Sequence, residues 1–307
     1  MGAKTRSAEL LYFIKISLFC IFLLVQKGFW FYNIHYYNLP VGRILEGDNL
    51  MKKFLALLMA AMLAMALVTA GCGGNDEKQA GGEKLLRVGT EPSFAPFEMQ
   101  AEGSEELTGF DMDLIRAIGK QLGYKVEISA MGFDALIPAL QADNIDVALA
   151  GMSITEERKQ QVIFSDPYYK SGLLVMVPKD NNDIKSIDDL KGKRIAVQIG
   201  TTGAFRAEKV EGAKVTAFND NGSAVLEMKN GAADAVINDA PVLKYFLTQG
   251  GSEYAKTVGE VLNAEDYGIA VKKGNDKLAA DINKALNELK QNGEFDKIYN
   301  KWFGEAK

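Results

Sequence analysis

The chain has 307 residues, of which 48% are hydrophobic and 24% charged, and its formal net charge is −5. Residues 72–307 carry 28 Lys and Arg against 37 Asp and Glu, so this acidic stretch gives no electrostatic reason to expect nucleic acid or an anionic membrane surface as partner. His35 is the only histidine and Cys20 and Cys72 are the only cysteines, which excludes Ser-His-Asp and Cys-His nucleophilic sites, imidazole or thiolate zinc sites and any disulfide after Cys72. Enzymatic chemistry after Cys72 would have to use carboxylates, Lys, Tyr or hydroxyls. We expect no metal and no cofactor.

Residues 51–72 read MKKFLALLMAAMLAMALVTAGC, in which two lysines precede an apolar run and small residues lead into a cysteine. This pattern predicts an export signal over residues 51–71. Its end, TAGC, resembles the lipobox of bacterial lipoproteins, which implies a diacylglycerol on Cys72 and attachment to the membrane. An ordinary signal peptide or an uncleaved anchor is the alternative.

Fifty residues precede this signal, including the apolar run LLYFIKISLFCIFLLV, which has neither helical amphipathicity nor helix caps. We expect residues 1–50 to result from a start codon assigned too far upstream, with Met51 as the true start. The alternative is a transmembrane segment at about residues 10–25, which its shortness and Lys15 disfavour. Residues 72–84 are polar and glycine-rich, and they predict a flexible tether.

Strand and helix patterns then alternate. Strands are predicted at Leu85–Gly89, Lys125–Ile128 and Asp146–Ala150, with helices at 109–123 and Phe133–Gln141 between them. This βαβαβ order predicts a parallel sheet with right-handed crossovers. Asp111 and Asp113 could suggest a metal site, but acidic residues are favoured in the first turn of a helix, and we expect Asp111 to cap it.

Residues 150–172, AGMSITEERKQQVIFSDPYYKSG, follow the last of these strands. Ser153 and Thr155 precede a short charged helix that carries Arg158. Free backbone N–H groups, a hydroxyl and a guanidinium can together hold a carboxylate. Taken alone, the same residues also favour another interpretation, a capped helix start with a solvated charged face.

The alternation then restarts, which predicts a second lobe of the same kind. The elements expected in it are an apolar strand at Leu173–Val177, a helix start at Ser186–Leu190, strands at Arg194–Gln198, Lys214–Phe218 and Asp234–Ile237, and helices at Ala204–Glu208 and Gly222–Lys229. A strand at Tyr267–Val271 and a helical region over 275–303, broken at Asn292–Gly293, follow. We expect the second lobe to interrupt the first, with hinge strands near 173–177 and 264–269.

Candidate binding groups recur at strand ends, where open parallel sheets place their ligands. The loop 200–203, GTTG, offers N–H groups to an anion, and without a following lysine it is not a nucleotide-binding loop. Asp239 could cap a helix or accept an ammonium group. Phe94 and Phe133 could be core residues or a platform for a ligand.

The runs VGTEPSFAPFE, GFDMDL, FDALIPAL, AGMSITEERK, FSDPYYKSGL, VQIGTTG, DAVINDAP, DYGIAV and IYNKWFG span residues 85–304. In this order they resemble the polar amino-acid-binding lipoproteins of ABC importers, solute-binding protein family 3. The resemblance implies an α/β, two-lobed periplasmic-binding-protein fold in which each lobe is a mainly parallel sheet flanked by helices, and two hinge strands join the lobes. Lobe 1 would comprise residues 85–172 and 266–307, and lobe 2 residues 173–265.

The resemblance also implies roles for individual residues. Arg158, with the N–H groups of Ser153 and Thr202, would hold the α-carboxylate of the ligand. Asp239, the Gly151 carbonyl and the Ser153 hydroxyl would hold the α-ammonium. Phe94 and Phe133 would enclose the aliphatic stem, and Glu91 and Gln198 would read the head group. The full set of ligand-binding residues that it implies is Glu91, Phe94, Phe133, Ala150, Gly151, Ser153, Arg158, Gln198, Thr201, Thr202 and Asp239.

Glutamine-binding relatives usually have Asp and Lys where this chain has Glu91 and Gln198, and His where it has Asn238. An acid without the lysine favours a cationic head group, so we expect arginine, with lysine, histidine or ornithine as related ligands and glutamine or cystine as alternatives. The resemblance further implies a monomer outside the cytoplasmic membrane that partners ABC permease subunits and is not an enzyme. A dehydratase using Glu91 as its acid and a sensor subunit are the rival functions.

Overall fold

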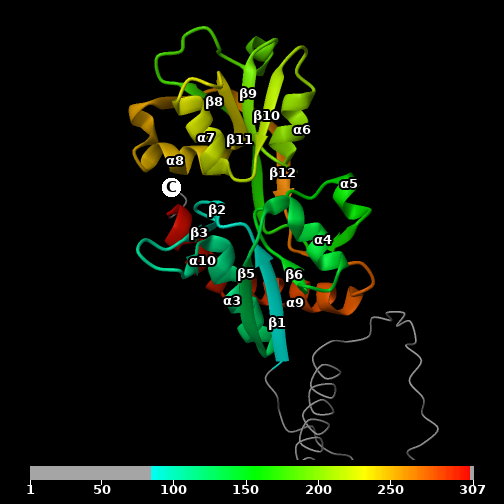
Figure 1. Ribbon diagram of the computed structural model, residues 1–307. Helices are drawn as coiled ribbons and strands as arrows, with labels where there is room; N and C mark the ends of the chain where they lie inside the picture. Colours follow the sequence, from blue (N-terminus) through cyan, green and yellow to red (C-terminus); the bar gives the residue numbers. More distant parts are fainter. Residues whose placement is uncertain (1–83, 305–307) are drawn as a thin grey trace, which may run out of the picture. The chain divides into compact units, whose positions relative to one another are not determined.

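Two five-stranded sheets flanked by helices form the described part of the chain (Figure 1). The computed structural model of the protein describes residues 84–304, which lie within one unit spanning Gln79–Lys307. The predicted N-terminal extension, signal peptide and lipid attachment at Cys72, and the tether up to residue 83, lie outside the described residues. Within residues 84–304, none of the helices combines the length and the hydropathy that a membrane-crossing segment needs.

The first sheet defines what we call the first lobe. Its strands are β1 (Lys84–Thr90), β5 (Tyr124–Ala130), β6 (Val147–Ala148), β7 (Val162–Phe164) and β13 (Ala270–Lys272), in the order β5-β1-β6-β13-β7. β1 pairs in parallel with β5 and β6, as the βαβαβ pattern predicted. β13, which comes from the end of the chain, pairs antiparallel with β6 and β7.

Helices bury the faces of this sheet. They are α3 (Phe110–Leu122), η2 (Phe133–Ala135), α4 (Leu136–Gln141), α5 (Glu156–Lys159), α9 (Asp276–Gln291) and α10 (Glu294–Phe303). α3 packs against α9 and α10, because apolar residues at helical spacing, such as Leu114 and Ile118 on α3, form one buried face. Gly293, with φ of 78°, separates α9 from α10, so the predicted break at Asn292–Gly293 is confirmed.

The second sheet defines the second lobe. Its strands are β8 (Tyr169–Pro178), β9 (Arg194–Gln198), β10 (Lys214–Phe218), β11 (Ala235–Asp239) and β12 (Ala255–Tyr267), in the order β10-β9-β11-β8-β12. β9 is parallel to β10 and β11, whereas β8 is antiparallel to β11 and β12. The helices are η3 (Ile187–Leu190), α6 (Thr202–Glu208), α7 (Asn221–Lys229), α8 (Ala240–Thr248) and η4 (Gly251–Glu253).

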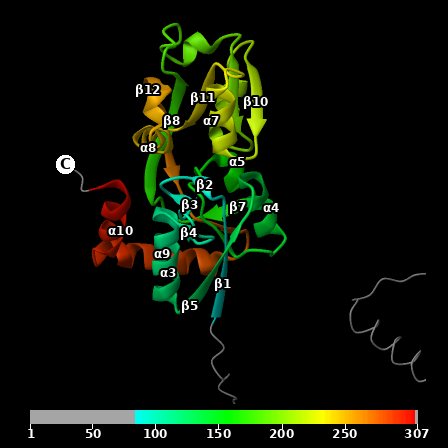
Figure 2. The same ribbon diagram turned by 60° about the vertical axis from the view of Figure 1, so that its left-hand side comes forward.

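β8 and β12 connect the lobes. They pair from Tyr169 and Tyr267 to Pro178 and Ala255, and Figure 2 shows them running together between the two sheets. The predicted lobe boundaries, after residues 172 and 265, fall inside these two strands. The predicted α/β organisation of two lobes joined by two strands is confirmed.

A small sheet joins the first lobe near the boundary. Its strands are β2 (Ser93–Phe94), β3 (Glu98–Gln100) and β4 (Leu107–Thr108). Antiparallel pairing sets Phe94 opposite Glu98. The residues after β1 therefore turn back toward the place where the two lobes meet.

Two local predictions were wrong. Asp111 does not cap α3: Gly109 is the N-cap, and the Asp111 carboxylate is fully buried, where it accepts from the N–H of Gly151 at 2.9 Å. Tyr267–Val271 is not one strand. The chain leaves β12 at Tyr267 and enters β13 at Ala270, because the N–H of Gly268 donates instead to the Met152 carbonyl as the chain passes between sheets. The strand expected at Asp146–Ala150 is limited to Val147–Ala148.

Candidate functional site

A polar cavity lies between the lobes, where the carboxyl ends of β1, β9 and β11 meet. It is lined by Glu91, Phe94, Glu98, Phe133, Gly151, Ser153, Arg158, Gln198, Thr201, Thr202 and Asp239. The structure thus brings together ten of the eleven residues predicted for the site. Ala150 is the exception, because it is buried in an apolar cluster of the first lobe and does not line the cavity.

Arg158 supplies the positive charge of the cavity. Thr155 caps α5 by accepting from the N–H of Arg158, which fixes the start of this short helix. The side chain is only 6% exposed, and its guanidinium donates to the carbonyl of Ser153 at 2.7 Å and to that of Gly200, in the other lobe, at 3.0 Å. It also lies 5.2 Å from the centre of the Phe133 ring.

No carboxylate of residues 84–304 forms an ion pair with Arg158. Burial lowers the pKa of its guanidinium, since the charged form is desolvated. An arginine is rarely buried without a charged partner, because two carbonyl oxygens replace only part of its hydration. This geometry therefore favours an anion as the missing partner.

Asp239 faces the cavity from the end of β11. It is 4% exposed, and its Oδ1 accepts from the hydroxyls of Tyr267 at 2.6 Å and Ser171 at 3.0 Å. Burial raises the pKa of this carboxyl to about 7. Its side chain makes no capping hydrogen bond to α8, so the helix-cap alternative is not realised. A cation in the cavity would stabilise the ionised carboxylate.

Glu91 and Gln198 meet across the lobe boundary. Oε2 of Glu91 accepts from the Ser93 hydroxyl at 2.8 Å and from Nε2 of Gln198 at 3.1 Å. Burial raises the pKa of Glu91, opposed by these hydrogen bonds. The pair gives one end of the cavity an acidic group held by an amide from the opposite lobe.

Gly151 and the two aromatic residues shape the wall of the first lobe. Gly151 has φ of 51°, and a Cβ at this position would lie 2.5 Å from Cε1 of Phe94, so only glycine fits. Phe94 is buried, and Phe133 is partly exposed at the start of η2. The backbone of residue 151 can therefore approach a molecule that lies against the Phe94 ring.

Sequence reasoning missed Glu98 as a cavity residue. Glu98 and Asp111 are fully buried, and both carboxyl oxygens of Glu98 lack a hydrogen-bond partner within residues 84–304. Burial, with Asp111 close by, raises the pKa of Glu98 well above its usual range, and burial raises the pKa of Asp111 to about 6. The only sequence signal was an acid between Phe97 and Met99 on a short strand. Glu91, Glu98 and Asp239 together set three carboxyl groups against one guanidinium in the cavity lining.

We expect Glu98→Gln to stabilise the ligand-free protein increasingly as the pH rises. The folded pKa of Glu98 lies above its unfolded value, so the stability that the neutral acid contributes is present below the unfolded pKa and lost as the pH rises toward the folded pKa. Glutamine does not titrate. Chemical denaturation at about pH 5 and about pH 8 should show that the wild type has a lower free energy of unfolding than Glu98→Gln, and that the difference is larger at the higher pH.

The matched control is Glu102→Gln, because Glu102 is an exposed acid four residues along the chain. It should change the free energy of unfolding equally at both pH values. A Glu98→Gln difference that does not vary with pH would show that this carboxyl does not titrate differently on folding.

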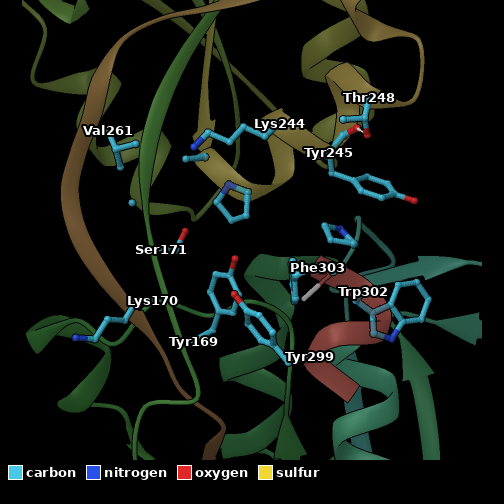
Figure 3. Close-up of a pocket in the computed structure, with 15 residues that line it drawn as sticks. Tyr169, Lys170, Ser171, Lys244, Tyr245, Thr248, Val261, Tyr299, Trp302 and Phe303 are labelled. Atoms are coloured by element: carbon cyan, nitrogen blue, oxygen red, sulfur yellow. Dashed lines mark hydrogen bonds between the residues drawn. The ribbon is translucent and has the colours of Figure 1, made fainter. Parts of the chain in front are cut away.

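A larger groove lies on another side of the lobe boundary, with a volume of about 760 Å³. Figure 3 shows Tyr245 and Thr248 on one wall and Trp302 and Phe303 on the other, with Lys170 and Lys244 at its edge. The described residues that line it include no Asp or Glu, and both lysines are exposed. Because no charged group there is desolvated, the smaller polar cavity is the better candidate site.

Comparisons with known proteins identify a family and similar structures. The family model described as bacterial extracellular solute-binding proteins, family 3, matches residues 86–305. The arginine-binding extracellular protein ArtP of Bacillus subtilis is 37% identical over 82% of this chain and 98% of its own length. A probable histidine-binding protein of Neisseria gonorrhoeae is 35% identical over 83% of this chain and 97% of its own. A solved ancestral arginine-binding protein bound to arginine is 51% identical, with a TM-score of 0.70, and the match covers 72% of this chain and 98% of the other.

Proposed function

The chain belongs to family 3 of the bacterial extracellular solute-binding proteins, as an amino-acid-binding protein of an ABC transporter, and we propose that its ligand is a basic amino acid, with arginine preferred. This proposal rests on the buried guanidinium of Arg158, which forms no ion pair within residues 84–304 and lies in a cavity that also holds three carboxyl groups. The curated relatives are named as binding proteins, and we propose binding and delivery, not catalysis, for this chain.

In the proposed complex, the two lobes hold the two charged ends of one amino acid. Arg158 binds the α-carboxylate in a bidentate manner, helped by the N–H groups of Ser153 and Thr202. Asp239, the Gly151 carbonyl and the Ser153 hydroxyl receive the α-ammonium. Phe94 and Phe133 enclose the stem. Since the ligand contacts both lobes, its binding favours the closed arrangement over an open one.

The charge balance of the cavity supports a cationic head group. An α-carboxylate and an α-ammonium neutralise Arg158 and Asp239, which leaves the Glu91 carboxylate without a cation, whereas burial raises the pKa of Glu98 and favours its neutral form. Binding a guanidinium or ammonium head would offset the cost of burying the Glu91 carboxylate. Glutamine and cystine are the alternative ligands, because Glu91 can also accept from an amide or an ammonium group.

The anchoring of the protein is a separate part of the proposal. We propose that Cys72 carries a lipid, that residues 72–84, the last of which begins β1, are the tether, and that the monomer lies on the outer side of the cytoplasmic membrane. The TAGC run and the apolar residues before it support this assignment. Metabolic labelling with a palmitate analogue, compared between the wild type and Cys72→Ala, tests it.

A thermal-shift panel tests the ligand. The twenty amino acids, ornithine and cystine should be added separately to the purified full chain. At about a thousand times Kd, a true ligand adds about 4 kcal/mol to the free energy of unfolding, which raises the melting temperature clearly. We expect arginine to give the largest shift. A panel without any shift would contradict amino-acid binding.

We expect Glu91→Gln to weaken arginine binding by about tenfold and to improve the relative affinity for glutamine, because an amide cannot compensate a guanidinium charge. Calorimetric titration with arginine and glutamine measures both changes. The matched control is Glu102→Gln, an exposed acid outside the cavity. An unchanged preference in Glu91→Gln would place recognition of the head group elsewhere.

A further inference from the structure

Glu265 connects the two lobes through a single oxygen atom. It lies on the connecting strand β12, and its Oε2 accepts from the Ser153 hydroxyl at 2.6 Å and from the Thr202 hydroxyl at 2.8 Å. Ser153 follows the first sheet, whereas Thr202 is the first residue of α6 in the second lobe. Among the described residues, these two hydrogen bonds place one carboxylate between a hydroxyl of each lobe.

These contacts fix the direction of both hydroxyl hydrogens. A hydroxyl has one hydrogen to donate and two lone pairs that accept. A carboxylate only accepts, so Ser153 and Thr202 must each donate toward Glu265. Their oxygen atoms are then left as acceptors, which suits an ammonium group and would disfavour a carboxylate at the same oxygens.

Glu265 is not itself a lining residue of the cavity, and it forms no ion pair with Arg158 within residues 84–304. Its negative charge nevertheless favours the charged form of Arg158 through space. Glu265 therefore leaves the guanidinium free to bind a ligand and acts through Ser153 and Thr202.

We infer that Glu265 is a positioning residue that turns the Ser153 and Thr202 hydroxyls into acceptors and holds the two lobes together at the hinge side of the cavity. Its effect on affinity rests on the proposed function, because Ser153 is placed there as an acceptor for the ligand ammonium. Its effect on lobe contact does not depend on any ligand. The residue thus acts on every amino acid alike, in contrast to Glu91, which acts on the head group.

Calorimetric titration of the full chain in detergent tests the effect on affinity. Glu265→Ala should weaken the binding of arginine, lysine and glutamine by a common factor of about ten, without changing the order of their affinities. Glu265→Gln should stay close to the wild type, because its amide oxygen can accept both hydroxyl hydrogens. The matched control is Glu260→Ala, which removes an exposed acid from the same strand.

A double-mutant cycle separates positioning from a general structural effect. Thr202→Val removes the hydroxyl and keeps the side-chain shape. Glu265→Ala should therefore reduce the affinity for arginine by a smaller factor in the Thr202→Val background than in the wild type. Full additivity, or wild-type affinity in Glu265→Ala, would overturn the inference.

Hydrogen exchange without added amino acid tests the lobe contact itself. Peptides covering 151–158 and 200–206 should exchange faster in Glu265→Ala than in the wild type, Glu265→Gln or Glu260→Ala. Equal exchange in all four proteins would overturn the inference even if amino acids bind. If no amino acid binds the wild type but exchange increases in Glu265→Ala, the proposed function fails and the lobe contact stands.

Discussion

We expect Arg158→Ala to weaken the binding of every amino acid by about 100-fold or more, because the ligand carboxylate would be buried without its cation. Arg158 is 6% exposed, and among the described residues no other Lys or Arg lines the cavity, so its guanidinium is the positive charge available to a ligand there. Calorimetric titration with arginine measures the loss.

The fold should survive this change. Arg158 donates to two carbonyl oxygens, but its charge is desolvated. Its removal loses these two hydrogen bonds and also removes the free-energy cost of burying the charge. The melting temperature of the ligand-free variant should stay within a few degrees of the wild type. The matched control is Lys159→Ala, since Lys159 is the exposed neighbour on α5 and pairs with Glu156 at the surface. Wild-type affinity in Arg158→Ala would contradict the assignment of Arg158 as the group that binds the ligand carboxylate.

The second large effect is expected for Asp239→Asn, which should weaken amino-acid binding by about 100-fold while preserving the shape of the side chain. The change removes the charge that faces the ligand ammonium. An amide can still accept from Tyr267 and Ser171, which hold the carboxylate now. Asp166→Asn is a suitable control, because Asp166 is exposed and outside the cavity.

The same residue predicts how affinity depends on pH. Burial raises the pKa of Asp239 to about 7, so below this value the carboxyl carries a proton that an incoming ammonium must displace. Wild-type affinity for arginine should therefore rise by about tenfold between about pH 6 and about pH 8, with proton release on binding at the lower pH. Asp239→Asn should lose most of this dependence. An equal pH dependence in both proteins would assign the titration to Glu91 or Glu98 instead.

Much of the fold could be predicted because its strands carry local signals. Arg194–Gln198 has a short apolar centre and Lys214–Phe218 alternates polar and apolar residues, and both segments are the observed β9 and β10. The break at Gly293 was equally local. Parallel pairing places the carboxyl ends of β1, β5 and β6 together, and likewise those of β9 and β11, and ten predicted site residues at or after these ends line the cavity.

What failed depends on contacts between distant residues. Asp111 has the local features of a helix cap, but its carboxylate is bound by Gly151 and Tyr168, which come from other elements. The sequence around Glu98 and Glu265 does not predict which residues these acids contact. Only the fold brings them to the cavity or its edge. Buried acids of this kind are set by tertiary structure and not by local propensity.

The most direct measurement is a crystal structure of the protein grown with L-arginine. We predict that the arginine lies between the lobes, with its carboxylate on the guanidinium of Arg158, its α-ammonium on Asp239 and its side-chain head near Glu91. An arginine bound elsewhere, or a structure in which Arg158 and Asp239 both turn away from the bound molecule, would contradict the proposed mode of binding.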